Sequence, residues 1–186
     1  MIATHNSATG EKSKSLLHSI GKVFAQTQSK TIKEQYEAGC RLFDLRVDYD
    51  LTLCHGLWKA NKDLTDLLIE MKKYVTEITY ITVTIEMNYP DEKISSLTKR
   101  IRKVFNLYGG LTKLVYIARK KPSWAILKEY RHIDCIKGYY SVPSLKEYLS
   151  RPYSDWRRYI PIPRILKRIT PVKDFNKDCF TMVDFL

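Results

Sequence analysis

Residues 34–47 read EQYEAGCRLFDLRV, and this stretch decides the fold class. The residues at 31–38 have helical composition, and the glycine that follows suits the C-terminal end of a helix. From 40 to 47, leucine, Asp44 and Arg46 alternate with Phe, Leu and Val, which is the period of a strand. The sequence therefore predicts a helix that leads into a strand with one apolar and one mostly polar face.

Similar signals continue on both sides of this stretch. The run YITVTIEM at 80–87 is dense in β-branched residues and predicts a strand. The segment 6–30 is rich in Ser, Thr, Lys and Gln, and we expect mostly loop there, with one helical turn at 15–20. Further strands are predicted at 1–5, 51–55, 113–118, 132–137 and 179–186, and helices or helical turns at 63–75, 91–107, 123–130 and 144–149.

Strands alternate with helices through most of the chain, which predicts a parallel α/β fold. The 186 residues fit a single domain, 1–186. A complete (β/α)8 barrel usually needs more than roughly 200 residues. We therefore expect a TIM (β/α) barrel that is distorted, pared down or incomplete.

Charge favours a polyanionic partner. The chain carries 32 Lys+Arg against 20 Asp+Glu, a formal net charge of +12. Such a field attracts nucleic acid or an anionic membrane face, although a basic solvated surface without any partner has the same composition. No leader-like segment and no apolar run of ~20 residues is visible, so we expect a soluble chain, cytoplasmic or peripheral at a membrane, with export left open.

The four cysteines form no CxxC pair, which argues against a zinc site. We expect Cys40, Cys54 and Cys179 to be buried thiols in or beside strands.

A set of polar residues is predicted at strand ends or on polar strand faces: His5, Asp44, Arg46, His55 and Glu86. The C-terminal ends of barrel strands meet at one mouth, so distant residues gather there. Two imidazoles can exchange protons with a phosphodiester while an arginine binds its oxygens.

Each member of the set also has an ordinary structural explanation. A lone histidine at a strand end is more often a packing or loop residue, and Asp44 with Arg46 can be a structural ion pair. Glu86 is more informative, because a carboxylate in so apolar a strand needs a partner or a wet cavity.

The order of motifs resembles the X-region of the phosphatidylinositol-specific phospholipases C, in its bacterial, metal-independent form. The resemblance is carried by THNS at 4–7, EQYEAGCRLFDLRV at 34–47, LCHG at 53–56, ITVTIEMN at 81–88 and MVDFL at 182–186.

The resemblance implies a distorted TIM barrel that cleaves phosphatidylinositol, or its glycosylated derivatives, to diacylglycerol and inositol 1,2-cyclic phosphate. His5 would be the general base and His55 the general acid. Arg46 would stabilise the phosphate, with Asp44 beside it in the catalytic set, and Asp184 would orient His5.

Arg46 implies that no metal cofactor is needed, because bacterial members carry arginine there and calcium-dependent members carry aspartate. Asn6 and Glu86 depart from the bacterial pattern. With Asp44, they leave calcium as an alternative cofactor, although Glu86 can instead pair with Arg46. We place both Asn6 and Glu86 among the substrate-binding residues.

The expected partner is a phosphatidylinositol-containing membrane surface, met peripherally by a monomer. The segment 151–168 mixes aromatic and basic side chains suited to that contact, while the role of the wider segment 141–178 is not assigned. Tyr139 or Tyr140 is the candidate to stack on inositol. His18 and His132 match no motif and are expected to be structural or solvated.

Three other functions compete with this one. The chain could be a weak or inactive relative that binds phosphoinositide or other polyanions. It could be a glycerophosphodiester phosphodiesterase-like enzyme, which Arg46 argues against. A nucleic-acid-binding protein would explain the charge, but it is not favoured because it leaves the ordered motifs unexplained.

Overall fold

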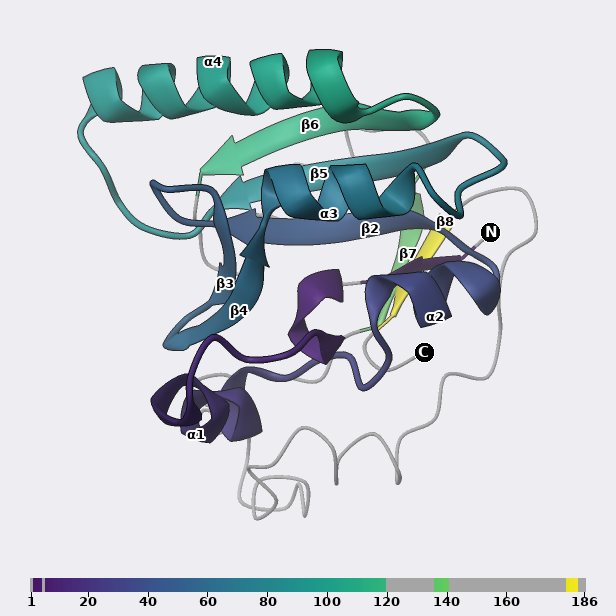
Figure 1. The fold of residues 1–186 in the computed structure, drawn as a ribbon, viewed down its shortest axis with the longest axis horizontal. Coiled ribbons are helices and arrows are strands. Elements are labelled where there is room, and N and C mark those ends of the chain that lie inside the picture. The colour runs from purple at the N-terminus through teal and green to yellow at the C-terminus, as the bar shows by residue number, and fades with distance from the viewer. Residues whose placement is uncertain (1, 5, 120–135, 141–179, 184–186) are drawn as a thin grey trace.

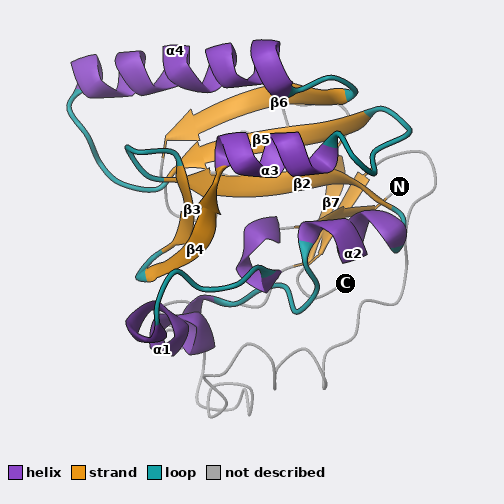
Figure 2. Cartoon of the chain, in the orientation of Figure 1, coloured by secondary structure: helices purple, strands orange, loops and turns teal. Residues whose placement is uncertain are grey.

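The computed structural model describes residues 2–4, 6–119, 136–140 and 180–183. These residues form one mixed sheet with helices packed along its outer face (Figure 1). Figure 2 shows the helices and strands in the same view. The strands are β1 (Ile2–Thr4), β2 (Cys40–Val47), β3 (Thr52–His55), β4 (Trp58–Asp63), β5 (Thr79–Ile85), β6 (Thr112–Arg119), β7 (Ile136–Tyr140) and β8 (Phe180–Val183). The helices are the 3-10 turn η1 (Ser7–Gly10), α1 (Leu16–Ala25), α2 (Ile32–Glu37), α3 (Leu64–Met71) and α4 (Asp91–Tyr108).

The sheet is an incomplete barrel. Parallel pairing gives the order β6-β5-β2-β1-β8-β7, and β2 also pairs antiparallel with the hairpin strand β3. Within the described residues no pairing joins β6 to β7, so the barrel is not closed. The N-terminal strand β1 lies between β2 and β8. The predicted first and last strands are therefore neighbours, as in a barrel.

The two faces of the central strands have different chemistry. Phe43, Leu45 and Val47 belong to a hydrophobic core, as do Ile81, Val83 and Ile85 of β5. The helices α2, α3 and α4 contribute their apolar faces to the same core. The opposite face carries Asp44, Arg46, Thr82 and Thr84, all of them buried. Burial of this polar face places the candidate site inside the barrel instead of on an exposed surface.

Sequence pattern located most of the elements. The strands at β2, β3, β5 and β6 and the helices α2, α3 and α4 are confirmed. The helix α2 begins with a capping box, in which Thr31 accepts from the Glu34 amide at 3.3 Å and the Glu34 carboxylate accepts from the Thr31 amide at 2.7 Å. Cys40 and Cys54 are buried free thiols, as expected, while Cys179 lies outside the described residues.

Three local expectations were wrong. The segment at 15–20 extends into the ten-residue helix α1. The strand β4, with sequence WKANKD, was not predicted because its alternation is short and is confined to buried Trp58 and Ala60. The sheet is also not wholly parallel, because β3 and β4 pair antiparallel as a hairpin. The predicted elements at 123–130 and 144–149 and the segment 151–171 lie outside the described residues.

The helices of the described residues include none with the length and apolar character to cross a bilayer.

Candidate active site

The candidate residues lie at the C-terminal ends of neighbouring strands. Asn6 follows β1, Arg46 is the penultimate residue of β2, His55 ends β3, and Glu86 follows β5. The parallel pairing of β1, β2 and β5 brings these ends to one edge, and the hairpin β3–β4 stands beside them (Figure 1). Residues separated by up to 80 positions therefore share one site.

His55 is held through one ring nitrogen. Its Nδ1 lies 2.5 Å from the carbonyl oxygen of Ala25, the last residue of α1. A carbonyl oxygen can only accept, so Nδ1 carries the proton and donates it. The other nitrogen, Nε2, lies 3.4 Å from Nδ2 of Asn6. Nε2 is consequently the nitrogen that faces the site and can exchange a proton there.

Asp44 ties the end of β1 to the two strands beside it. Its Oδ2 accepts from the backbone amide of Asn6 at 3.3 Å, and its Oδ1 accepts from the Thr82 hydroxyl at 3.2 Å. Asn6 itself has a left-handed backbone conformation, with φ of 46°, which asparagine tolerates better than most residues. Asp44 therefore fixes the position of Asn6 against His55.

Glu86 organises the other half of the site. One carboxylate oxygen accepts from Nη1 of Arg46 at 2.9 Å, and the other accepts from the backbone amide of Gly56 at 2.9 Å. The side chains of Arg46 and Glu86 are 10% and 2% exposed. Glu86 thus pairs with Arg46, which is one of the two roles that the sequence left open for it. It also holds the turn directly after His55.

A second polar group, formed by Asp48, Asp50 and Lys59, was not predicted from the sequence. Asp48 forms an ion pair with Lys59, and its carboxylate accepts from the Asp50 amide at 3.2 Å. Burial raises the pKa of the Asp48 carboxyl, and the hydrogen bond between the Asp48 and Asp50 side chains acts in the same direction. Burial, with the charges of Glu86 and Asp48 nearby, also raises the pKa of the Cys54 thiol.

The carboxylates of Asp44 and Glu86 are both engaged by protein donors. Both carboxylate oxygens of Asp44 and both of Glu86 already accept hydrogen bonds from protein donors. The Arg46 guanidinium supplies positive charge 2.9 Å from the Glu86 carboxylate. In the described part of the chain, no cluster of three or more His, Cys, Asp and Glu side chains is arranged for a metal.

Two catalytic candidates, His5 and Asp184, lie outside the described residues. The residues just before them, Thr4 and Val183, are register partners on the parallel strands β1 and β8. Tyr139 and Tyr140 belong to β7, and their side chains are not described. His132 and the segment 151–168 also lie outside. His18 contacts Ser15 at the start of α1, 2.7 Å between Nδ1 and Oγ, in keeping with a structural role.

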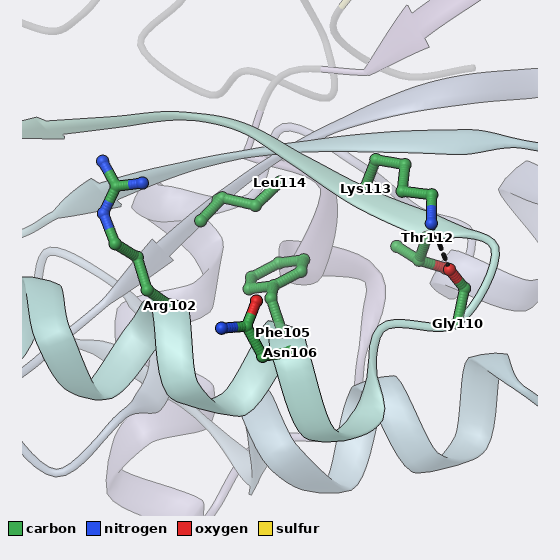
Figure 3. A pocket seen from close by; sticks show the side chains of 7 residues that line it. All are labelled: Arg102, Phe105, Asn106, Gly110, Thr112, Lys113 and Leu114. Atoms are coloured by element: carbon green, nitrogen blue, oxygen red, sulfur yellow. Dashed lines mark hydrogen bonds between the residues drawn. The ribbon is translucent and has the colours of Figure 1, made fainter.

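A separate groove lies away from these residues, between α4 and β6. It encloses about 550 Å³, and in Figure 3 the Phe105 ring lies between the helix and the strand, while Lys113 bonds the Gly110 carbonyl at 2.8 Å. It is lined by Arg102, Phe105, Asn106, Gly110, Thr112, Lys113 and Leu114. None of the candidate catalytic residues contributes to it.

Comparison with known proteins finds similarity to members of the family that the motifs resemble. A 1-phosphatidylinositol phosphodiesterase of Listeria monocytogenes is 28% identical over 87 residues, which cover 47% of this chain and 27% of that protein. One from Staphylococcus aureus strain Newman is 27% identical over 93 residues, covering 48% of this chain and 30% of the relative. The solved structure of phosphatidylinositol-specific phospholipase C from Listeria monocytogenes matches 99% of this chain and 87% of its own, with a TM-score of 0.59 and 16% identity.

This chain resembles the bacterial phosphatidylinositol-specific phospholipases C. The structural match confirms the expected fold, an α/β barrel of TIM type that is distorted and not closed. No family model matches the sequence. The segments aligned by sequence span less than a third of each curated relative, at 27% and 30% of their lengths.

In this phospholipase C-like chain, some of the site's supports could not have been named from the motifs. The Ala25 carbonyl and the Gly56 amide are backbone groups, which no side-chain pattern reports. Thr82 could have been inferred from the alternation of β5, because it lies on the same face as Glu86. The sequence thus offered candidate side chains more readily than the backbone groups that bind them.

Proposed function

We propose that this chain cleaves the phosphodiester of phosphatidylinositol, or of a glycosylated derivative, to diacylglycerol and inositol 1,2-cyclic phosphate. The observation that carries the proposal is the link between His55 and Arg46. Glu86 binds the Arg46 guanidinium and the Gly56 amide at once, so an imidazole and a buried guanidinium face one site. A phosphodiester needs both a proton donor and a cation of this kind.

In the proposed reaction His5 removes the proton from the inositol 2-hydroxyl. The resulting oxygen attacks phosphorus, and the bond from phosphorus to the diacylglycerol oxygen breaks. His55 donates a proton from Nε2 to that leaving oxygen while Nδ1 remains bonded to Ala25. Arg46 balances the negative charge that builds on the phosphoryl oxygens. His5 ends protonated and His55 neutral, so the proton balance is closed.

The remaining site residues have supporting roles in this proposal. Glu86 orients Arg46, and Asp44 positions Asn6 against His55. Asp184 follows the register partner of Thr4, which supports a role in orienting His5. We assign inositol stacking to Tyr139 or Tyr140, as the resemblance implies. The reaction uses no cofactor, since Arg46 takes the place of a metal ion.

The proposed partner is a membrane surface that contains phosphatidylinositol, approached peripherally by a monomer. The curated relatives are named for activity on this lipid. The net charge of +12 favours the anionic face of a membrane.

The test is turnover of phosphatidylinositol vesicles with and without EDTA, with the cyclic phosphate followed by phosphorus NMR. We expect turnover that survives EDTA. Replacing His55 by alanine should lower the rate by roughly 100- to 10,000-fold, because a positioned general acid is lost. His18→Ala is the matched control and should retain the wild-type rate, since the ring of His18 contacts Ser15 at the start of α1.

Three outcomes would count against parts of the proposal. Full turnover by His55→Ala would remove the acid role of that residue. Turnover that appears only with added calcium would contradict the cation role of Arg46. Vesicle binding without any turnover would favour the inactive, polyanion-binding alternative.

A further inference from the structure

A buried hydroxyl without a partner lies on the inner face of β5. Thr84 is 1% exposed, and its Oγ1 is hidden from solvent. Within the described residues it is the one buried threonine whose hidden hydroxyl has no hydrogen-bond partner. Two residues earlier, the Thr82 hydroxyl donates to Asp44 at 3.2 Å. Two residues later, the Glu86 carboxylate accepts from Arg46 at 2.9 Å. A buried hydroxyl in this state destabilises the fold.

The strand register places Thr84 directly opposite Arg46. In the parallel pairing of β2 with β5, Arg46 is the register partner of Thr84, and both are buried on the polar inner face. Figure 1 shows the two strands side by side. Arg46 bonds Glu86, which lies two residues beyond Thr84 in the chain. The Arg46 side chain therefore extends from beside Thr84 toward the C-terminal end of β5.

We propose that Thr84 is a positioning residue for Arg46. When a phosphodiester binds, the Thr84 hydroxyl accepts a hydrogen bond from the guanidinium and so holds it against the phosphoryl oxygens. The inference rests on the proposed function, in which Arg46 balances the charge on those oxygens. Because Thr84 is too buried to touch the substrate, it acts through Arg46.

The donors and acceptors of these groups fit this role. A guanidinium has five N–H donors and no acceptor, whereas a threonine hydroxyl can accept hydrogen bonds through two lone pairs. A bidentate contact with a phosphodiester takes two of the five donors. A guanidinium that turns from Glu86 toward the phosphate finds an acceptor at Thr84 that has no other hydrogen bond to break.

Packing alone does not account for a threonine at this position. Valine has nearly the same shape, suits a strand equally well and carries no hydroxyl to bury. Valine would therefore be the more stable choice if position 84 only filled space. A buried polar group that lowers stability beside a reactive side chain is typical of a site where function and stability are in conflict.

The test compares Thr84→Val, which removes the hydroxyl and keeps the shape, with Thr84→Ser, which keeps the hydroxyl. We expect Thr84→Val to raise the urea midpoint of unfolding by roughly 0.5 M. The same variant should lower kcat/KM on a short-chain, water-soluble phosphatidylinositol at least about tenfold. Thr84→Ser loses a methyl group from the barrel interior, so it should unfold at a lower urea concentration than the wild type, yet keep kcat/KM within about twofold. The control for stability is Thr82→Val, which should lower the midpoint because the Thr82 hydroxyl bonds Asp44.

A second measurement does not depend on turnover. The Arg46 Nε–H resonance, assigned by its absence from Arg46→Met, is followed by NMR as inorganic phosphate is added. We expect Thr84→Val to bind phosphate at this site at least about fivefold more weakly than the wild type, and Thr84→Ser to bind it as the wild type does.

The outcomes separate this inference from the proposed reaction. Unchanged kcat/KM in Thr84→Val, in a protein that turns over the substrate, would overturn the positioning role and leave the reaction standing. Equal losses in Thr84→Val and Thr84→Ser would also overturn it, because the side-chain shape and not the hydroxyl would then be responsible. Equal phosphate affinity in the wild type and Thr84→Val would overturn it whether or not the protein is active. A wild type without turnover, whose phosphate binding at Arg46 still depends on the Thr84 hydroxyl, would support the positioning role while the proposed reaction fails.

Discussion

The ion pair between Arg46 and Glu86 gives the sharpest prediction about stability. Its nitrogen and oxygen lie 2.9 Å apart, and the two side chains are 10% and 2% exposed. Removing one partner of such a pair leaves a charge buried without its counter-charge. We therefore expect Glu86→Gln to lower the free energy of unfolding by about 3–5 kcal/mol, and Arg46→Met to do so by a similar amount.

The double variant Arg46→Met/Glu86→Leu distinguishes two contributions to the free energy of unfolding: the destabilisation by a lone buried charge and the stabilisation by the ion pair. Because an apolar pair leaves no uncompensated charge, the double variant should lose less than the sum of the two single variants, with a coupling of at least about 2 kcal/mol. The Gly56 amide, which bonds Glu86, would still lose its acceptor, at a cost of about 1–3 kcal/mol. The double variant should nevertheless have no phosphodiesterase activity, since the guanidinium is gone.

Urea unfolding followed by circular dichroism measures these free energies by linear extrapolation. The control is Asp91→Asn, which breaks the exposed pair of Asp91 with Arg119 at 2.8 Å, where the side chains are 85% and 55% exposed. Exposed pairs contribute about 0–1 kcal/mol, so this variant should barely change stability. If Glu86→Gln behaves like Asp91→Asn, the pair is not buried in solution and the argument for Arg46 as a fixed cation fails.

Two further predictions concern backbone space and thiol burial. Gly10→Ala should lower the free energy of unfolding by about 1–3 kcal/mol, because the new Cβ would lie 1.8 Å from the Lys30 carbonyl oxygen. Gly39→Ala is the control, since φ is +94° and no atom lies within 4 Å of the new Cβ; it should cost only about 1 kcal/mol of backbone strain. Equal urea midpoints for the two variants would contradict crowding at Gly10. Burial raises the pKa of the Cys40 thiol to about 12 and that of Cys54 as well, so the folded chain keeps protons that an unfolded chain releases above about pH 8.5. The stabilisation is complete below that pH and is lost as pH rises toward the folded pKa, by about 1.4 kcal/mol per pH unit for each thiol. A Cys40→Ala/Cys54→Ala variant should show a shallower decline between pH 9 and 11 in urea titrations, and an identical slope would refute thiol burial as the cause.

Local sequence determined the elements whose residues carry their own signal. The alternation in Cys40–Val47 and the β-branched run in Thr79–Ile85 specify strands, because one side of each packs in the core. The capping residue Thr31 and the following Gly39 mark the limits of α2. The candidate residues Arg46 and His55 were likewise visible, because each lies within a short motif of neighbouring residues.

Tertiary structure alone decided how these parts meet. α1 was predicted as loop with one helical turn because its surroundings are polar, and β4 was missed because its alternation is short. The two elements contact each other, and Lys22 of α1 lies over the Trp58 ring of β4. The Arg46–Glu86 pair spans 40 positions and the bond from His55 to Ala25 spans 30. Such contacts depend on which strands pair and in which register, and a local pattern of side chains contains no information about that pairing.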